Sequence, residues 1–231
     1  KFHPILKQTL WGGERIIPYQ ELASELSRVG ESWELSGMPG SESVVAEGPW
    51  TGSTLPELIG RFGAELLGKA NYARFGQEFP LLVKFIDARE DLSIQVHPDD
   101  ELARKRHGKS GKCEMWYVLE AEPGASLLTG FSRPIAPAEY ERRVADNTLT
   151  DVLNRQAIAS GDVFYLPAGR VHSIGKGSFI VEIQQSSDIT YRIYDFDRRD
   201  AAGNSRELHT ELAREAIDFE SSENSRITYA P

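Results

Sequence analysis

The chain has 231 residues, 40% of them hydrophobic and 26% charged, which is typical of a globular protein with a core of its own. The net charge of −9 argues against a nucleic-acid-binding surface, and no apolar run approaches the roughly 20 residues needed to span a bilayer. The N-terminal residues lack a signal-peptide pattern, and a lone cysteine excludes both an intrachain disulfide and a cysteine-based zinc cluster, so we expect a cytoplasmic protein.

The first third of the chain is predicted to be rich in loops, because glycine and proline are scattered through residues 29–52. A helix is predicted to follow over residues 53–68. Thr54 stands three residues before Glu57, which is the spacing of a capping box, and Pro56 falls in the first turn, where proline is favoured.

From residue 81 onward the pattern is that of short strands, rich in β-branched and aromatic residues. We predict strands over residues 81–86, 92–96, 114–121, 125–131, 162–169, 178–185 and 190–196. Helices are predicted over residues 98–108, 136–147 and 206–219, with a further turn or two over residues 150–157. Many short strands with few candidate parallel crossovers favour an antiparallel sandwich or barrel.

The segment "GDVFYLPAGRVHSIG" carries the strongest chemical signal. The spacing of Gly161, Pro167, Gly169 and His172 is similar to that of the second motif of the cupin barrel. A strand ends there at a Pro-x-Gly turn, and the histidine that begins the next strand is expected to face the interior. A small barrel of this kind has room inside for one metal ion or ligand.

A second polar group lies upstream, in the segment "LSIQVHPDD". Gln95 and His97 are two residues apart, so on a strand both side chains project from one face. They occupy the positions that a cupin's first motif fills with two histidines, and Glu114 supplies the carboxylate of that motif. With His172 these residues offer nitrogen and oxygen ligands that zinc accepts. Strand alternation places Lys112 and Trp116 on the same face as Glu114 and turns Cys113 away.

Several segments taken together resemble the type I mannose-6-phosphate isomerases (phosphomannose isomerases), zinc-dependent members of the cupin superfamily. The segments are "ILKQTLWGGERI", "GESWELSG", "FIDAREDLSIQVHPDD", "GKCEMWYVL", "LPAGRVHSIG" and "QQSSDITYRIYDFDR". The resemblance implies a mainly β fold, a cupin-type antiparallel β-barrel (jelly roll) with a few added helices. Members normally continue into a further C-terminal β-domain. We therefore expect residues 1–231 to form one cupin-type catalytic domain, with that C-terminal domain missing or truncated.

The resemblance also implies an activity and a set of site residues. These enzymes interconvert mannose 6-phosphate and fructose 6-phosphate through a cis-enediol(ate), and Gln95, His97, Glu114 and His172 would hold the Zn²⁺. Arg192 matches the family's active-site arginine, with a catalytic and substrate-binding role. Lys84 and Lys112 match lysines that line the pocket, Lys84 for substrate binding and Lys112 for catalysis. The general base stays open between Lys112 and a metal-bound water.

Other interpretations remain open from the sequence alone. The chain could isomerise a different or unphosphorylated sugar, or could be a non-catalytic, metal-containing cupin that binds sugar. Arg192 could pair with Asp195 or Asp197 at a strand edge, and Lys84 could be an edge-facing lysine. His107 is expected at a solvated helix end. The expected partner is a small sugar phosphate, with no nucleic acid and no membrane, and the oligomeric state stays open.

Overall fold

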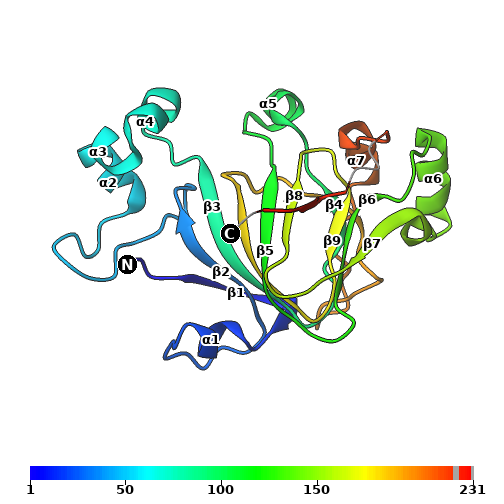
Figure 1. Cartoon of the computed structure of the whole chain (residues 1–231), viewed down its shortest axis with the longest axis horizontal. Coiled ribbons are helices and arrows are strands. Elements are labelled where there is room, and N and C mark those ends of the chain that lie inside the picture. The colour runs from blue at the N-terminus through cyan, green and yellow to red at the C-terminus, as the bar shows by residue number, and fades with distance from the viewer. Residues whose placement is uncertain (221–223, 230–231) are drawn as a thin grey trace.

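The computed structural model describes residues 1–220 and 224–229, which form two antiparallel sheets that face each other (Figure 1). One sheet has seven strands in the order β1–β2–β3–β10–β5–β8–β12, and the other has five in the order β11–β4–β9–β6–β7. The larger sheet contains β1 (Ile5–Gly13), β2 (Val29–Ser36), β3 (Leu81–Ala88), β5 (Glu114–Ala121), β8 (Val163–Leu166), β10 (Ser178–Gln185) and β12 (Arg226–Ile227). The smaller sheet contains β4 (Ile94–Val96), β6 (Ser126–Phe131), β7 (Leu153–Ala157), β9 (His172–Ile174) and β11 (Tyr191–Tyr194).

This arrangement confirms the predicted class, a mainly β chain of cupin-type jelly-roll architecture. Each strand pairing within the described residues is antiparallel. No pairing there joins the two sheets, so the interior lies between two separate hydrogen-bonded sheets and not within a closed ring.

The loop prediction for the first third was only partly right, because residues 37–52 form loops and turns with isolated bridges, whereas β1 and β2 are strands that pair with each other. Gly30, one of the glycines that suggested turns, and Gly12 of β1 allow close contact between these strands. A Cβ on Gly12 would lie 2.4 Å from the Arg28 carbonyl oxygen, and one on Gly30 would lie 2.1 Å from Thr9 Oγ1. Glycine in a strand is characteristic of such close approach. The prediction of a further turn or two of helix over residues 150–157 was also only partly right, since a 3₁₀ turn over Leu149–Val152 is followed by β7.

Each predicted helix contains a shorter observed one. The capping box of α2 (Leu55–Phe62) is confirmed, because Thr54 Oγ1 accepts from the Glu57 N–H and a Glu57 carboxylate oxygen accepts from the Thr54 N–H. The helix stops at Gly63, whose φ of +48° leaves the helical region. The remaining helices are α1 (Ile16–Tyr19), α3 (Ala64–Leu67), α4 (Lys69–Phe75), α5 (Asp100–His107), α6 (Pro137–Ala145) and α7 (Thr210–Ala216). The helix predicted over residues 53–68 is thus divided into α2 and α3 at Gly63, whereas α1 and α4 were not predicted. No helix in the described residues is long and apolar enough to cross a membrane.

The space between the sheets has an apolar part and a polar part. Inward-facing residues of the larger sheet are apolar over most of its length and pack in one buried cluster with residues of the smaller sheet. That cluster contains Trp11, Ile86, Ala88, Leu92, Trp116, Val118, Leu127, Phe164, Leu166, Ile174 and Ile180. Nearer the ends where β5 and β9 begin, the inward positions become charged. Glu182 of β10 stands opposite Lys84 of β3, and Gln184 stands opposite Glu114 of β5. A buried polar layer therefore adjoins the apolar cluster in the space between the two sheets.

Candidate metal centre

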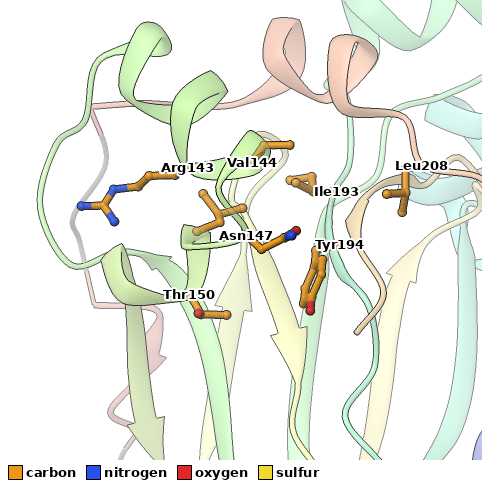
Figure 2. A pocket seen from close by; sticks show the side chains of 8 residues that line it. Arg143, Val144, Asn147, Thr150, Ile193, Tyr194 and Leu208 are labelled. Atoms are coloured by element: carbon orange, nitrogen blue, oxygen red, sulfur yellow. The ribbon is translucent and has the colours of Figure 1, made fainter. Parts of the chain in front are cut away.

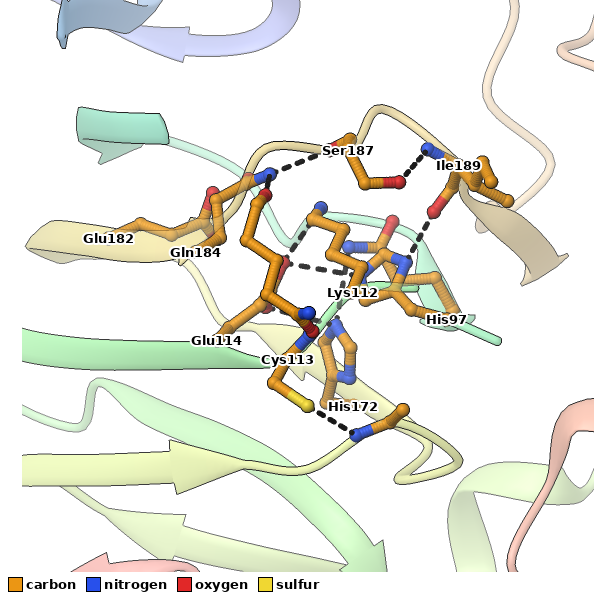
Figure 3. Close-up of polar contacts among 12 residues, drawn as sticks. His97, Lys112, Cys113, Glu114, His172, Glu182, Gln184, Ser187 and Ile189 are labelled. Atoms are coloured by element: carbon orange, nitrogen blue, oxygen red, sulfur yellow. Dashed lines mark hydrogen bonds and ion pairs between the residues drawn. The ribbon is translucent and has the colours of Figure 1, made fainter. Parts of the chain in front are cut away.

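Three buried side chains from three strands converge in this polar layer (Figure 3). His97 directly follows β4, Glu114 is the first residue of β5, and His172 is the first residue of β9. Their Nε2 and carboxylate atoms face one another, with 3.2 Å between His97 Nε2 and Glu114 Oε1 and 3.5 Å between His172 Nε2 and Glu114 Oε2. One potential ligand atom from each residue lies within 4.8 Å of the others.

The hydrogen bonds of the two imidazoles orient their lone pairs toward the centre of this cluster. His97 Nδ1 donates to the Ile189 carbonyl oxygen, and His172 Nδ1 donates to the Arg170 carbonyl oxygen, each at 2.8 Å. With the proton on Nδ1, each Nε2 is an acceptor, as a metal-ligating histidine requires.

Unsatisfied buried acceptors are a second sign that this cluster suits a cation. His97 Nε2 and Glu114 Oε2 have no hydrogen-bond partner among the described residues, while Lys112 Nζ lies 2.7 Å from Glu114 Oε1. Buried polar atoms are nearly always satisfied, because leaving one unpaired costs about 1–3 kcal/mol. Acceptors that face each other at this spacing fit a shared divalent cation, so the residues present fit a metal ion.

The ionisation of these groups also suits a metal. Burial lowers the pKa of His97 to about 3, with a further contribution from Lys112, and burial lowers the pKa of His172 as well. For Glu114, burial alone would raise the pKa, but Lys112 and His97 together hold it well below its usual value. At neutral pH the cluster therefore has two neutral imidazoles and a carboxylate, which is the state that binds a cation.

Gln95, the fourth predicted ligand, lies at the edge of the same cluster. It stands opposite His172 in the pairing of β4 with β9, and its Nε2 is 3.4 Å from His172 Nε2. Amide nitrogen and oxygen are assigned from their hydrogen bonds, and a half-turn of this amide would present its oxygen to the centre instead. The structure thus brings all four predicted ligands together.

Lys112 lies beside the centre, whereas Cys113 lies outside it. Lys112 Nζ is 2.7 Å from Glu114 Oε1, and the lysine is 5% exposed. The sulfur of Cys113 instead accepts from the Ala168 N–H at 3.4 Å. The expected alternation of this strand, with Lys112, Glu114 and Trp116 facing inward, is confirmed.

A second buried charge cluster adjoins the centre, and sequence reasoning found only one of its members. Lys84 Nζ lies 3.1 Å from Glu182 Oε1 and 3.6 Å from Glu31 Oε2, and Trp116 Nε1 donates to Glu182 Oε2. Burial and then Glu114 raise the pKa of Glu182, and the pKa of Lys84 is raised because Glu182 and Glu31 outweigh burial. Glu182 could have been found from the sequence, because it is a charged residue at an inward position of the largely apolar run "SFIVEIQQ".

Arg192 stands opposite Gln95 in the pairing of β11 with β4, so the two side chains lie on the same side of the smaller sheet. Its Nη1 donates to the Glu207 carbonyl oxygen at 3.0 Å, and its buried Nε has no partner among the described residues. Asp195 pairs with Arg198 and Arg206 instead. The strand-edge ion pair with Asp195 or Asp197 does not occur within the described part of the chain.

A separate pocket opens beside β11, and its lining shares no residue with this centre (Figure 2). Its walls come from α6, the turn that follows it, β11 and the segment before α7. The lining residues are Arg143, Val144, Asn147, Leu149, Thr150, Ile193, Tyr194 and Leu208. None of the predicted site residues lines it. His107, expected at a solvated helix end, is exposed, although its Nε2 lies 2.8 Å from the Tyr191 hydroxyl.

Two facing sheets that enclose a His–Glu–His cluster define a cupin-type protein with a candidate metal centre. Comparison with known proteins narrows this class. Residues 1–131 match the family model of phosphomannose isomerase type I, catalytic domain. The chain is 38% identical to the mannose-6-phosphate isomerase ManA of Bacillus subtilis over 95% of its own length and 68% of the relative. It is also 38% identical to a mannose-6-phosphate isomerase of Streptococcus mutans, over 92% of its own length and 65% of that protein.

A solved structure agrees with these relatives. The crystal structure of mannose 6-phosphate isomerase from Bacillus subtilis superposes with a TM-score of 0.86 at 36% identity, covering 94% of this chain and 68% of that one. The chain therefore belongs to the type I phosphomannose isomerase family. It spans about two thirds of the length of the curated relatives it matches.

Proposed function

We propose that the chain is the catalytic part of a zinc-dependent isomerase that interconverts mannose 6-phosphate and fructose 6-phosphate. The observation that carries the proposal is the buried His97–Glu114–His172 cluster, whose acceptor atoms face one another. Among the described residues no donor reaches His97 Nε2 or Glu114 Oε2, and Glu114 Oε1 pairs with Lys112. The names of the similar proteins supply the substrate.

Gln95, His97, Glu114 and His172 would hold the zinc ion. Nitrogen and carboxylate oxygen are ligands that zinc accepts, and a site with a neutral amide as its fourth group can exchange that group or add a substrate oxygen. When bound, a divalent cation acts as a Lewis acid that stabilises negative charge on a substrate oxygen. Because Glu31, Glu114 and Glu182 outnumber Lys84 and Lys112, the ion would also reverse the net charge of this buried layer.

The reaction moves a proton from C2 of mannose 6-phosphate to C1, through a cis-enediol(ate). Lys112 is placed to donate a hydrogen bond to a substrate oxygen that gains charge, since its ammonium group lies in the water-excluded layer. Glu182 joins Lys112 as a candidate for the proton-transfer group. Its raised pKa brings a buried carboxyl closer to neutral pH, where a general base works best.

Arg192 and Lys84 differ in how available they are to substrate. Lys84 is already paired with two carboxylates, so we assign it mainly to orienting Glu182 at the edge of the substrate site. Arg192 has a buried Nε with no partner among residues 1–220 and 224–229, and a guanidinium matches the geometry of a phosphate group. We therefore assign Arg192 to contact with the sugar phosphate.

The test combines elemental analysis with a coupled isomerase assay on wild type and on His172→Ala. We expect wild type to contain zinc and to turn over mannose 6-phosphate. We expect His172→Ala to lose most of its zinc and at least about a hundredfold in kcat/KM, because a missing ligand disrupts both metal binding and charge stabilisation. Full activity in a metal-free variant would refute the proposal.

The same assay separates the alternatives. Equal turnover of mannose and mannose 6-phosphate would indicate a different sugar specificity, because the contact of Arg192 with the phosphate would then contribute nothing. Tight sugar binding without turnover by the zinc-loaded protein would indicate a non-catalytic sugar-binding cupin.

A further inference from the structure

A chain of hydrogen bonds leads from the end of β10 to the metal ligand His97 (Figure 3). It begins at Gln184, passes through the turn that contains Ser187, and ends at the Ile189 carbonyl group. None of these three residues belongs to the four proposed ligands or to the charged groups beside them.

Gln184 fixes the conformation of the turn that follows β10. The side chain is 1% exposed, and its Nε2 donates to the carbonyl oxygens of Ser187 at 2.7 Å and Gln185 at 2.9 Å. Both partners are carbonyl groups, which only accept, so the orientation of this amide is settled by its contacts. One side chain therefore ties together two carbonyl groups of a tight turn.

The same turn supplies the hydrogen-bond acceptor for His97. The Ile189 N–H donates to Ser187 Oγ at 3.4 Å, and the Ile189 carbonyl oxygen accepts from His97 Nδ1 at 2.8 Å. That acceptor lies 92 positions away from His97 in sequence. His172 differs, because its acceptor, the Arg170 carbonyl group, lies only two residues before it. The orientation of His97 thus depends on the conformation of a distant turn.

We infer that Gln184 is a positioning residue of the metal centre. It holds the turn so that the Ile189 carbonyl group keeps the His97 proton on Nδ1 and directs Nε2 toward Glu114. This inference rests on the proposed metal site. Groups that orient a metal-ligating histidine commonly change metal affinity 10- to 100-fold when they are removed, and Gln184 acts one step further out. We therefore expect an effect of about tenfold.

The test substitutes Gln184→Met, which keeps the length of the side chain and removes its donors. Ser178→Ala is a matched control at the other end of β10. Ser178 is fully buried, and its Oγ donates to the Gly175 carbonyl oxygen at 2.7 Å, which also ties a turn. No hydrogen bond among the described residues joins that turn to a proposed ligand. Each variant is loaded with Zn²⁺ or Co²⁺, and affinity is measured by chelator competition. The visible absorption of the Co²⁺ form reports ligand geometry independently of activity.

We expect Gln184→Met to bind Zn²⁺ about tenfold more weakly and to change the Co²⁺ spectrum, and Ser178→Ala to stay within about twofold of wild type. Wild-type affinity in Gln184→Met, or an equal loss in both variants, would overturn the inference. If Gln184→Met does not fold, Gln184→Leu, which also lacks the amide donors, takes its place, and unchanged affinity and spectrum there would overturn the inference as well. Failure of wild type to bind metal would instead defeat the proposed metal site, and the inference with it.

Discussion

Glu114 contacts both histidines of the centre and the ammonium group of Lys112. The glutamate is 1% exposed. A buried carboxylate remains ionised only if nearby positive charge offsets the loss of water. In the absence of metal, Lys112 is the largest source of that compensation. The lysine therefore keeps Glu114 anionic, and in the proposed reaction it would also lie close to the charge that develops on the substrate.

Replacement of Lys112 separates these two roles. We expect Lys112→Met to retain zinc, because Lys112 is not a proposed ligand and its removal takes a repelling charge away from the cation. The isomerase kcat is expected to fall by about a hundredfold or more, in the range typical of a lost proton-transfer or charge-stabilising group. Zinc content and steady-state kinetics on the same preparation measure both effects. Wild-type kcat in Lys112→Met would show that the lysine has no part in the chemistry.

At the scale of elements, α6 is held by a cluster of surface charges at its start. Glu139 Oε1 lies 2.6 Å from Arg133 Nη2, in the segment before the helix, and 2.8 Å from Arg143 Nε, one turn later. The hydrogen bond from Arg133, followed by that from Arg143, lowers the pKa of Glu139 to about 2. The ion pairs thus connect the entry segment to the helix.

The pH dependence of this cluster has a definite sign. The pKa of Glu139 is lower in the folded state than its ordinary value of 4.5, so the stabilisation is fully present above pH 4.5 and is lost as the pH falls toward 2. We expect Glu139→Gln to lower Tm slightly at pH 7, with a difference from wild type that shrinks below pH 4.5 and vanishes only as the pH falls through about 2 in a thermal-denaturation series. Glu65→Gln is the control, because Glu65 makes no ion pair within the described residues. A Tm difference that persists unchanged to pH 2.5 would contradict the role of this charge.

At the scale of the whole molecule, the proposed zinc ion would link the two sheets. His97 and His172 come from the smaller sheet and Glu114 from the larger, and hydrogen-bonded strand pairs do not join the sheets in the described residues. A ligand that binds only the folded state stabilises it by RT ln(1 + [L]/Kd), or about 2.7 kcal/mol at a hundredfold excess over Kd.

Metal removal should therefore destabilise the chain measurably. For a protein of this size about 1 kcal/mol shifts Tm by roughly 2–4 °C, so chelation should lower Tm by roughly 5–10 °C relative to protein in a hundredfold excess of zinc over Kd. Adding zinc back after the chelator is removed should restore the original value. Differential scanning calorimetry measures the shift. Identical Tm values with zinc and with chelator would argue against an ion that binds between the sheets.

Local pattern in the sequence determined a large part of this description. Strand alternation placed Gln95 with His97 and Lys112 with Glu114, because side chains two apart share a face whatever the strand pairs with. The capping box of α2 was readable for the same reason, since its hydrogen bonds join neighbours in sequence. Gly30 of β2 misled the loop prediction, because glycine signals a turn and a close strand contact equally well.

The tertiary structure alone decided which distant residues meet. Glu182 faces Lys84, and the Ile189 carbonyl group accepts from His97, through pairings of segments far apart in the chain. Strand order and register set such contacts, and no spacing within one segment encodes them. The burial that lowers the pKa values of both histidines also arises only when the two sheets close over them. The sequence by itself therefore determined the kinds of groups present, whereas the packing of the two sheets decided their partners and their ionisation.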